Sequence, residues 1–385
     1  MMQAAVRLGR KIGLMARYHR DTQSFMANKL DPTSKLFLSY VPELSGDQHV
    51  LLLGLLEAGL VSAIANSLSP AGRLVIADYN SAALAKAASA LKTTAFQQAK
   101  LISPDQLGDY TDASFDAAFV HIVPFPNRAL LERLISEAGR LLKPNAMLYV
   151  GGPRDKGIVS VGTYVEELFG SAGNSQYAKG CRVITAVRPS HWQGQSAAAQ
   201  TELIDIELRG QRLSLELRDG VFARGGLDDG SLMLIEAMQV EEALQILDLG
   251  CGGGLVGMLA ARLAPQAQVT LLDSNLAAVE LARANLERNQ INNARVLVSD
   301  VCSAVRDQQF DTIVTNPPFH QGRLQTTDTA LRFFKESAQQ LQPHGKLFIV
   351  CNRFLPYEQV LREIFASVQE VRGDGRFRVL LARHS

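Results

Sequence analysis

Short runs of apolar residues alternate with longer segments of helical pattern along most of the chain. Three runs in the first half, HVLLLG, RLVIAD and FDAAFVH, are apolar at most positions, which is typical of buried strands. Residues 55–68, 81–91 and 128–142 have the length and composition of helices. Strands that alternate with helices of this length predict a parallel sheet covered by helices on both faces.

The same order of segments returns 195 to 196 residues later. HVLLLGLLEAGLVSAIAN parallels QILDLGCGGGLVGMLAAR, RLVIADYNSAALAKAASAL parallels QVTLLDSNLAAVELARANL, and SFDAAFVHIVPF parallels QFDTIVTNPPFH. GRLLKPNAMLYVGG and QQLQPHGKLFIVCN correspond after a shift of a few residues. Four blocks in the same order indicate a duplicated α/β domain. We predict two tandem Rossmann-like domains, with residues 1–188 forming the first and residues 189–385 the second.

The second copy carries glycine and polar residues that the first copy lacks. It has Asp248, Gly250, Gly252 and Gly254 where the first copy has Leu52, Gly54, Leu56 and Ala58. It also has Asn316, Pro317 and Pro318 where the first copy has His121, Ile122 and Val123. Leucine and alanine side chains fill space through which a backbone would approach a ligand. We therefore expect the first domain to be degenerate and catalytically silent, and to serve as a support for folding and for docking of a substrate.

The segment between the two copies has three distinct parts. Residues 189–200 are rich in Ser, Gln and Ala and read as a linker or exposed hairpin. Apolar and polar residues then alternate on both sides of Arg209 and Gly210, which predicts a β-hairpin. Asp228 to Ser231 can cap a following helix, and the loop around Phe222 is then free to fold over a ligand.

Composition and charge narrow the class of protein further. Of the 385 residues, 47% are hydrophobic and 20% are charged, as in globular proteins with two cores. Without an apolar run that could cross a bilayer, and without a signal-peptide pattern, we expect a cytoplasmic protein with no membrane contact. The four cysteines lack the spacing of a zinc site or a disulfide framework, so we expect no metal and treat them as packing residues: Cys181, Cys251, Cys302 and Cys351.

A net charge of +1 provides no general attraction to nucleic acid, so an RNA-binding face would have to be a local patch. The one visible basic cluster, here called the N-terminal basic arm, comprises Arg7, Arg10, Lys11, Arg17, His19 and Arg20. Apolar residues between them permit an amphipathic helix whose cationic face could contact phosphates. An ordinary solvated helix is the alternative.

Candidate chemistry is concentrated at the predicted carboxyl ends of the strands in the second copy. The strand QILDLG runs into a glycine-rich turn, which allows backbone to approach a ligand closely. Asp273 ends the next strand, where an acid can accept hydrogen bonds from both hydroxyls of a ribose. Dinucleotides also bind to turns of this kind. Asp248 before the first glycine, Asp300 after the following strand and the later NPPF turn favour S-adenosylmethionine instead.

The stretch TNPPFH, residues 315–320, predicts a binding site for an amine. Two consecutive prolines remove two backbone N–H groups and stiffen the turn, so it offers acceptors without competing donors. The Asn316 side-chain oxygen and the Pro317 carbonyl could accept the hydrogens of an exocyclic NH2 group and localise its lone pair for attack. Phe319 could stack on the ring that carries the amine. A strand-ending turn with a buried Phe is the structural alternative.

These motifs together resemble a known family. ILDLGCGGG, LLDSN, the Ser299–Asp300 pair and TNPPFH are similar to the motifs of class I S-adenosylmethionine-dependent methyltransferases. NPPFH together with GVFARGGLDDGS and a degenerate first copy resembles the bacterial ribosomal RNA guanine-N2 methyltransferases of the small subunit and their large-subunit siblings. The resemblance covers essentially residues 45–385. It implies transfer of a methyl group from S-adenosylmethionine to the exocyclic N2 of one guanine in ribosomal RNA. Of the two groups, the sequence resembles the small-subunit enzymes, which act on 16S rRNA, more than the large-subunit ones.

The resemblance also assigns roles by position. It implies that Asp248, Gly250, Cys251, Gly252 and Gly254 hold the methionine part of the cofactor. Asp273, with Ser274 beside it, would hold the ribose, Asp300 would meet the adenine, and Asn316 would border both cofactor and guanine. The catalytic set is then Asn316, Pro317, Pro318 and Phe319.

Three alternatives stay open at this point. A large-subunit guanine-N2 methyltransferase would share every motif. A protein glutamine N5-methyltransferase faces the same need to accept amide hydrogens, although such enzymes resemble NPPY and lack a duplicated first half. A non-catalytic RNA-binding assembly factor would keep the fold without the chemistry. The expected partner is ribosomal RNA or a ribosomal subunit, bound by a monomer.

Overall fold

The computed structural model describes residues 30–384, except for 45, 55–56, 124, 126, 171, 174–175, 193, 195–200, 226 and 319–324. The chain divides into two compact units: the first comprises residues 1–78, 83–125 and 131–196, and the second residues 197–385 with the short segments 79–82 and 126–130. The N-terminal basic arm predicted above lies outside the described residues. Within the described part, no helix is both long and apolar enough to cross a membrane.

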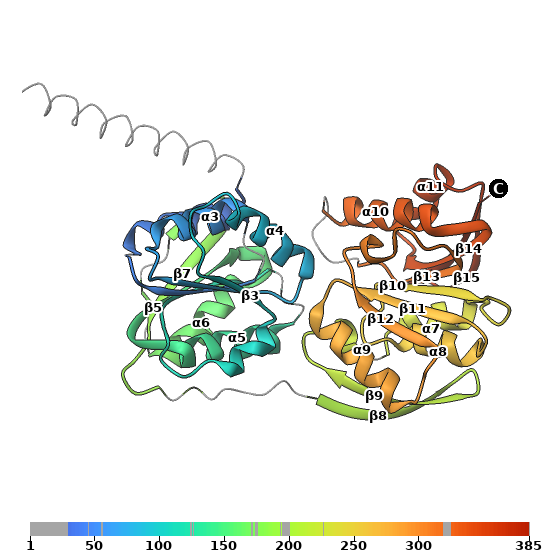
Figure 1. The fold of residues 1–385 in the computed structure, drawn as a ribbon, viewed down its shortest axis with the longest axis horizontal. Coiled ribbons are helices and arrows are strands. Elements are labelled where there is room, and N and C mark those ends of the chain that lie inside the picture. Colours follow the sequence, from blue (N-terminus) through green and yellow to red (C-terminus); the bar gives the residue numbers. More distant parts are fainter. Residues whose placement is uncertain are drawn as a thin grey trace, which may run out of the picture. The chain divides into compact units, whose positions relative to one another are not determined.

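The first unit contains a seven-stranded sheet. Its elements are α2 (Pro32–Leu38), β1 (His49–Leu53), α3 (Ala58–Ser67), β2 (Arg73–Ala77), α4 (Ser81–Leu91), β3 (Ala99–Ile102), β4 (Phe115–His121), α5 (Arg128–Leu141), β5 (Leu142–Pro153), α6 (Ile158–Phe169), β6 (Gln176–Ala178) and β7 (Cys181–Val187). The strand order is β3-β2-β1-β4-β5-β7-β6. Figure 1 shows α3 and α4 on one side of this sheet and α5 and α6 on the other, as the sequence predicted.

The second unit repeats this arrangement after a β-hairpin. Its elements are β8 (Thr201–Leu208), β9 (Gln211–Arg218), α7 (Asp229–Ala237), β10 (Gln245–Leu249), α8 (Leu255–Leu263), β11 (Gln268–Asp273), α9 (Leu276–Arg288), β12 (Ala294–Val298), β13 (Phe310–Thr315), α10 (Gln325–Gln340), β14 (Leu341–Asn352), α11 (Tyr357–Arg362), β15 (Ser367–Gly373) and β16 (Phe377–Arg383). The sheet order, β12-β11-β10-β13-β14-β16-β15, is that of the first unit. The predicted duplication is therefore confirmed.

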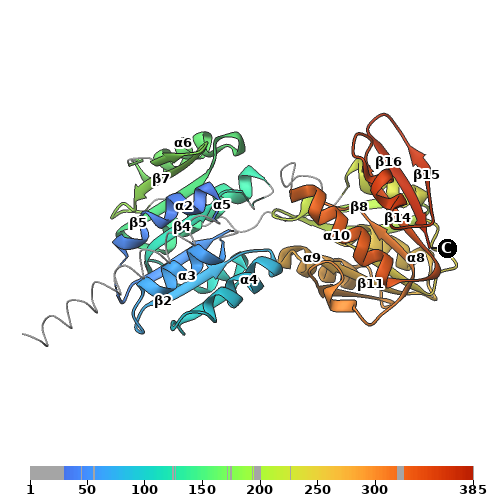
Figure 2. The same ribbon diagram turned by 90° about the horizontal axis from the view of Figure 1, so that it is seen from above.

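One expectation about the sheets was wrong in part. The first five strands of each sheet are parallel, but β16 pairs with both β14 and β15 in the antiparallel sense, and β7 does the same with β5 and β6. The short connection between β15 and β16 makes these two strands run in opposite directions, and β16 lies between β15 and β14 in the sheet. Figure 2 shows β14, β15 and β16 together at one edge of the second sheet.

Alternate residues of each strand serve two different cores in the second unit. Ile246 packs with α7, α8 and α9, whereas its neighbour Leu247 packs with α10 and α11. Both side chains are fully buried. This alternation follows from the strand geometry, in which successive side chains point to opposite faces. It explains why the strands are apolar at nearly every position.

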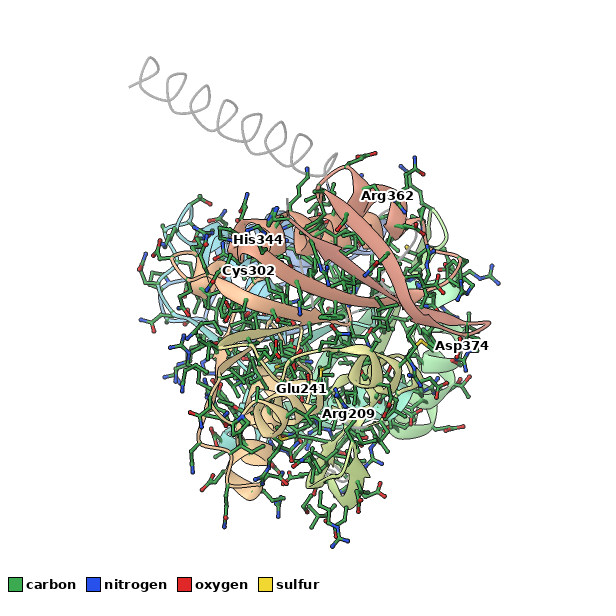
Figure 3. All side chains as sticks on the ribbon, turned by 90° about the vertical axis from the view of Figure 1, so that its right-hand side faces the viewer. Arg209, Glu241, Cys302, His344, Arg362 and Asp374 are labelled. Atoms are coloured by element: carbon green, nitrogen blue, oxygen red, sulfur yellow. The ribbon has the colours of Figure 1, made fainter. Side chains whose placement is uncertain are left out.

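The predicted β-hairpin is confirmed as β8 and β9. Its two turn residues, Arg209 and Gly210, have φ of 48° and 72°, which is the backbone of the two-residue turn that suits the twist of a hairpin. The Arg209 guanidinium donates to the carbonyls of Ile235 and Met238 at the end of α7, at 3.2 and 2.9 Å. Figure 3 shows Arg209 near Glu241, which accepts another hydrogen bond from it. The turn thereby caps α7, the helix that begins beside the candidate site.

Candidate functional site

The glycine-rich turn between β10 and α8 is built from left-handed backbone. Gly250, Gly252 and Gly254 have φ of 78°, 54° and 90°. Residues other than glycine adopt such backbone angles only with strain. The N–H groups of Gly250 and Cys251 both donate to the Leu272 carbonyl, at 2.8 and 2.9 Å. The turn is thereby fastened to the end of β11.

Glycine also allows helix α8 to pack closely against the sheet, in addition to allowing a ligand to approach the turn. A Cβ on Gly257, in the first turn of α8, would lie 2.6 Å from Leu271 and 2.9 Å from Asp248 Oδ2. A Cβ on Gly252 would meet nothing within 4 Å, so this part of the turn faces open space. The sequence interpretation assigned the glycines to ligand approach. The structure adds that Gly257, which the interpretation did not single out, is needed for packing of the helix against the sheet.

Asp248 is almost fully buried at the end of β10, with 2% of its surface exposed. Its Oδ2 accepts a hydrogen bond of 2.7 Å from the Gly257 N–H, so the carboxylate anchors the N-terminal turn of α8. Burial, together with the nearby charge of Asp273, outweighs this hydrogen bond and raises the pKa of Asp248 to about 7. Ionisation of Asp248 is therefore unfavourable unless a cation lies close to its carboxylate.

Asp273 ends β11 and is only partly buried. Its Oδ2 accepts from the Gly252 N–H at 2.9 Å and its Oδ1 from the Asn275 N–H at 2.8 Å. Each carboxylate oxygen keeps a second lone pair, which suits acceptance of two hydroxyl hydrogens. Burial raises the pKa of Asp273 despite these hydrogen bonds. Ser274 follows at the predicted place, between Asp273 and the N-cap of α9.

Asn275 is a member of the site that the sequence interpretation missed. It is the N-cap of α9, since its Oδ1 accepts from the N–H groups of Ala277 and Ala278. Its Nδ2 donates to the Gly220 carbonyl at 3.0 Å and so holds the loop that leads to Phe222. Phe222 is half exposed, and the expectation that its loop folds over a ligand stays a prediction.

Asp300 follows β12 and meets a partner that the sequence interpretation did not foresee. Arg332, on α10, donates two hydrogen bonds to its carboxylate, each of 3.1 Å. Both side chains are partly exposed, so the pair contributes little to stability. The backbone N–H of Asp300 donates to the Ser303 hydroxyl at 3.1 Å, which holds the backbone at the end of β12. A contact of Asp300 with adenine stays a prediction, and Arg332 would border it.

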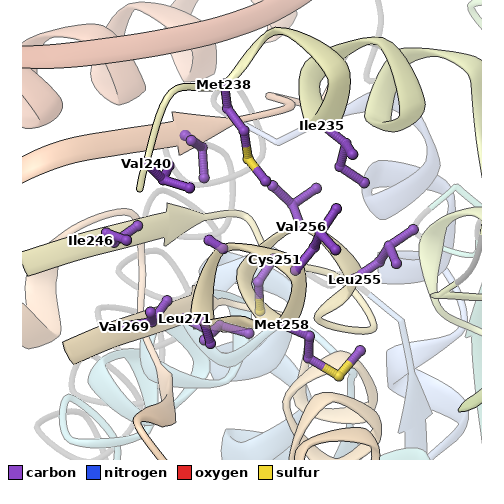
Figure 4. Close-up of a cluster of buried hydrophobic side chains, with 14 of the residues drawn as sticks. Ile235, Met238, Val240, Ile246, Cys251, Leu255, Val256, Met258, Val269 and Leu271 are labelled. Atoms are coloured by element: carbon purple, nitrogen blue, oxygen red, sulfur yellow. The ribbon is translucent and has the colours of Figure 1, made fainter. Parts of the chain in front are cut away.

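Cys251 lies in the glycine turn, but its side chain points into the core. The residue is only 8% exposed and packs in the cluster formed by α7 and α8, next to Leu255, Val256 and Met258 (Figure 4). Only its backbone could therefore take part in the cofactor contact that the resemblance implied. All four cysteines are buried and free, which agrees with their interpretation as packing residues.

Asn316 follows β13 directly and is held by the start of α7. Its Nδ2 donates to the Ser231 hydroxyl at 3.1 Å and lies 3.4 Å from Asp228 Oδ1. Asp228 is the N-cap of α7, as predicted, because its Oδ1 accepts from the N–H groups of Gly230 and Ser231. The Oδ1 atom of Asn316 is buried, and no described residue donates a hydrogen bond to it.

The rest of the amine-gripping stretch is described only as far as its second proline. Pro317 is buried and Pro318 is exposed, while Phe319 lies outside the described residues. Thr315, which the sequence interpretation left without a role, donates from its fully buried hydroxyl to the Leu249 carbonyl at 2.7 Å. This bond joins the ends of β13 and β10, so Asn316 begins beside the glycine turn. Asp248, Asp273 and Asn316 therefore lie at the carboxyl ends of neighbouring strands of the second sheet, β10, β11 and β13, and their joint role as a site stays a prediction.

The corresponding edge of the first unit has different chemistry. Leu52, at the position of Asp248, is fully buried in the core, and Asp78, at the position of Asp273, is only 3% exposed. His121, at the position of Asn316, places its Nε2 3.8 Å from the carboxylate of Asp31. Gly54 keeps the left-handed turn with φ of 91°. This copy keeps the backbone of the turn and the acid at the position of Asp273, but it lacks the acid at the position of Asp248 and the amide at the position of Asn316.

No cluster of His, Cys, Asp and Glu side chains in the described parts of the chain has the arrangement of a metal site. The polar groups of the second unit instead fit an organic cation with hydroxyls and an amine donor. Twin seven-stranded sheets of this order, with acids and a glycine turn at the carboxyl ends of the strands of one copy, define tandem class I methyltransferase domains.

Comparison with known proteins agrees with this class. The family model described as methyltransferase small domain matches twice, at residues 16–185 and 212–381. A protein named ribosomal RNA small subunit methyltransferase C from Hahella chejuensis is 30% identical over 274 residues, which are 70% of this chain and 80% of that protein. A namesake from Erwinia tasmaniensis is 38% identical over 170 residues, which are 44% of this chain and only 49% of that protein.

A solved structure extends the likeness to nearly the whole chain. The 16S rRNA N2 methyltransferase of T. Thermophilus, in complex with AdoMet and guanosine, aligns over 93% of both chains with a TM-score of 0.78 and 26% identity. The chain belongs to the methyltransferase small domain family and, within it, groups with the ribosomal RNA small subunit methyltransferase C proteins. The resemblance stated from the motifs is confirmed.

Proposed function

We propose that the protein transfers a methyl group from S-adenosylmethionine to the exocyclic N2 amine of a guanine in ribosomal RNA of the small subunit. The observation that carries this proposal is the buried Oδ1 of Asn316, which receives no hydrogen bond from the described residues. A buried acceptor without a donor is costly unless a ligand supplies the hydrogen. The relatives named for methylation of small-subunit RNA support the same substrate.

The residues present fit the cofactor. Asp273 offers two carboxylate oxygens with spare lone pairs at the strand end, and Gly252 borders open space beside it. Asp248 supplies a buried carboxylate that a nearby cation would stabilise in its charged form. When bound, the cofactor supplies a methyl group that its sulfonium already activates. The solved relative with AdoMet supports this choice of cofactor.

The contribution of the chain to the reaction is positioning. Asn316 Oδ1 accepts one hydrogen of the amine, and the Pro317 carbonyl accepts the other, because the prolines leave no N–H group to compete. The nitrogen lone pair is thereby turned away from the ring system and toward the methyl group. Solvent can take the released proton, so the site needs no general base. A guanine within an RNA helix has to be extruded to reach Asn316.

The proposed substrate determines the location and the binding partner of the protein. Bacterial ribosomes are assembled in the cytoplasm, so we place the enzyme there. We propose that it acts as a monomer bound to ribosomal RNA or to a ribosomal subunit. Asp248, Asp273 and Asn316 of the second unit carry the chemistry. The first unit, with Leu52 and His121 at the corresponding places, serves as the RNA-docking and folding support.

Methyl transfer to isolated substrates tests the proposal. Purified protein is incubated with labelled S-adenosylmethionine and, separately, small subunits, large subunits, naked ribosomal RNA and a release factor. We expect label in small-subunit RNA, recovered as N2-methylguanosine after nuclease digestion and mass spectrometry, and far slower labelling with the Asn316→Ala variant. Label in the release factor would indicate a glutamine methyltransferase instead, and the absence of label in every substrate would indicate a non-catalytic protein.

A further inference from the structure

The orientation of the Asn316 amide is determined by its neighbours. A side-chain amide has an oxygen that accepts and a nitrogen that donates, and the two ends differ little in shape. Asp228 can only accept while it is ionised, and it lies 3.4 Å from Nδ2 of Asn316. The Ser231 hydroxyl, 3.1 Å from Nδ2, accepts as well. A hydroxyl could also donate to a reversed amide, so the Asp228 carboxylate decides the orientation: it obliges the NH2 group to face α7 and the oxygen to face away, and Ser231 then accepts the second hydrogen bond.

This orientation matters because the reversed amide would defeat the reaction. With its NH2 group outward, Asn316 would present donors to the amine of the substrate, and two donors cannot pair. The rotation of an amide by half a turn is otherwise nearly free in a side chain of this shape. Some element of the structure therefore has to hold the productive orientation before the substrate arrives.

We infer that Asp228 and Ser231 are positioning residues that aim Asn316 Oδ1 at the substrate amine. Their own places are secured by the helix, since Asp228 Oδ1 accepts from the N–H groups of Gly230 and Ser231 at 3.0 and 3.1 Å. Gly230 keeps the helix start narrow, because a Cβ there would lie 3.1 Å from Asp228 Oδ1 and 3.6 Å from Asn316 Nδ2. The inference rests on the proposed function and deepens it.

The first unit contains a corresponding contact between a helix cap and a strand end, without an amide. Asp31 caps α2, and its Oδ1 accepts from the N–H groups of Thr33 and Ser34 at 2.8 and 3.1 Å. Asp31 and Ser34 thus have the spacing of Asp228 and Ser231. The residue opposite the cap is His121, whose Nε2 faces the Asp31 carboxylate at 3.8 Å. The contact between helix cap and strand end recurs in both copies, and only the second copy places an amide there.

Ser231→Ala is the sharpest test, because it removes one acceptor of Asn316 and leaves the helix cap intact. Alanine is also a good helix former. We expect the rate constant for methyl transfer to fall about tenfold, the effect of one neutral hydrogen bond. The affinity for S-adenosylmethionine, measured by calorimetry, should not change. Ser231→Thr keeps a hydroxyl and should restore most of the rate.

A double variant separates positioning from a general structural effect. Single-turnover rates are measured for Ser231→Ala in the wild-type and in the Asn316→Ala background. If Ser231 acts through Asn316, the second substitution should cause no further loss once the amide is gone. Guanosine affinity, measured by titration, should show the same pattern and does not require turnover. A tenfold loss that persists in the Asn316→Ala background would overturn the inference.

Ser34→Ala in the first unit is the matched control. It removes a hydroxyl from the same position of a capped helix and should leave the rate of methyl transfer unchanged. If the wild-type enzyme is active and Ser231→Ala is equally fast, the positioning role is contradicted and the proposed function still stands. A wild-type protein that neither methylates RNA nor binds guanosine would overturn the proposed function together with this inference.

Discussion

Asn316 carries the most specific chemistry of any single residue in the chain. We expect Asn316→Ala to lower the rate of methyl transfer by roughly 100- to 1000-fold, because one preorganised hydrogen-bond partner in such a site is worth on the order of 3 kcal/mol. The affinity for S-adenosylmethionine should be nearly unchanged. Single-turnover assays with labelled cofactor, paired with calorimetry, measure the two quantities separately. Near-normal turnover would remove Asn316 from the role assigned to it.

Asp248 makes a prediction about stability and pH. Its pKa is raised to about 7 in the folded protein, whereas an unfolded chain has a value near 4. The buried neutral carboxyl therefore stabilises the fold fully below about pH 4, and this contribution, at most about 4 kcal/mol, is lost as the pH rises through 7. In Asp248→Asn, an amide replaces the acid and this dependence should vanish.

Urea unfolding of the ligand-free protein between pH 5 and pH 8 measures this difference. The free energy of unfolding of the wild type should fall more steeply across this range than that of Asp248→Asn. Asparagine keeps a side-chain oxygen that can accept from the Gly257 N–H, so the variant should fold. Parallel curves for the two proteins would mean that Asp248 is ionised in the fold at neutral pH.

Sequence reasoning identified the residues of the site better than their partners. Asp248, Asp273 and Asn316 lie at strand ends where the motifs placed them. The partners of Asn316 lie 85 and 88 residues away along the chain, and Arg332 lies 32 residues from Asp300. Contacts over such distances depend on how helices pack against the sheet, and no local pattern of residues encodes them. A helix cap, by contrast, is a local signal, and Asp228 could be recognised from it.

At the scale of elements, the end of β11 is the place where cofactor binding should be most sensitive. We expect Asp273→Ala to weaken S-adenosylmethionine by about 2 kcal/mol, or roughly thirtyfold, because hydrogen bonds from hydroxyls to a carboxylate are lost. The same substitution at Asp78, at the end of β2 in the first unit, should leave binding unchanged. Calorimetry of the two variants compares matched positions, and a stoichiometry of two cofactors per chain would contradict the silence of the first copy.

The loss at Asp273 has two sources that a second variant can divide. The carboxylate also accepts from the N–H groups of Gly252 and Asn275, so its removal loosens the glycine turn and the N-cap of α9. Asp273→Asn keeps one oxygen and should lose less affinity than the alanine variant.

The order of elements could be predicted from the sequence to a large extent, because buried parallel strands and their helices leave strong apolar patterns. The helix α4 has the predicted bounds and α5 ends one residue before its predicted end, whereas α2 was missed, since seven residues hold too few turns to show a period. The antiparallel placement of β7 and β16 was also missed. It depends on how a late hairpin inserts beside β5 or β14, and strand patterns alone do not report this.

At the scale of the whole molecule, a near-neutral chain has to recognise a polyanion. We expect charge reversal at Arg7, Arg10, Lys11 and Arg17, which lie outside the described residues, to raise the Michaelis constant for RNA. Removal of each cation that binds a phosphate should reduce the salt dependence of binding by about one unit of slope. Turnover at saturating RNA should change little. Binding titrations across a range of salt concentrations provide the measurement, and an unchanged affinity and slope would leave the arm as a solvated helix.

The fully buried Leu52 and the His121–Asp31 contact have an evolutionary consequence. An acid introduced at position 52 would enter a fully packed core, and an amide introduced at position 121 would still lack the buried acid that Leu52 has replaced. Either change alone restores no reaction, so selection has no single step to favour. A gene copy that has lost its chemistry on two separate strands does not regain it by stepwise mutation, and its surface can then diverge without the constraint of a working active site.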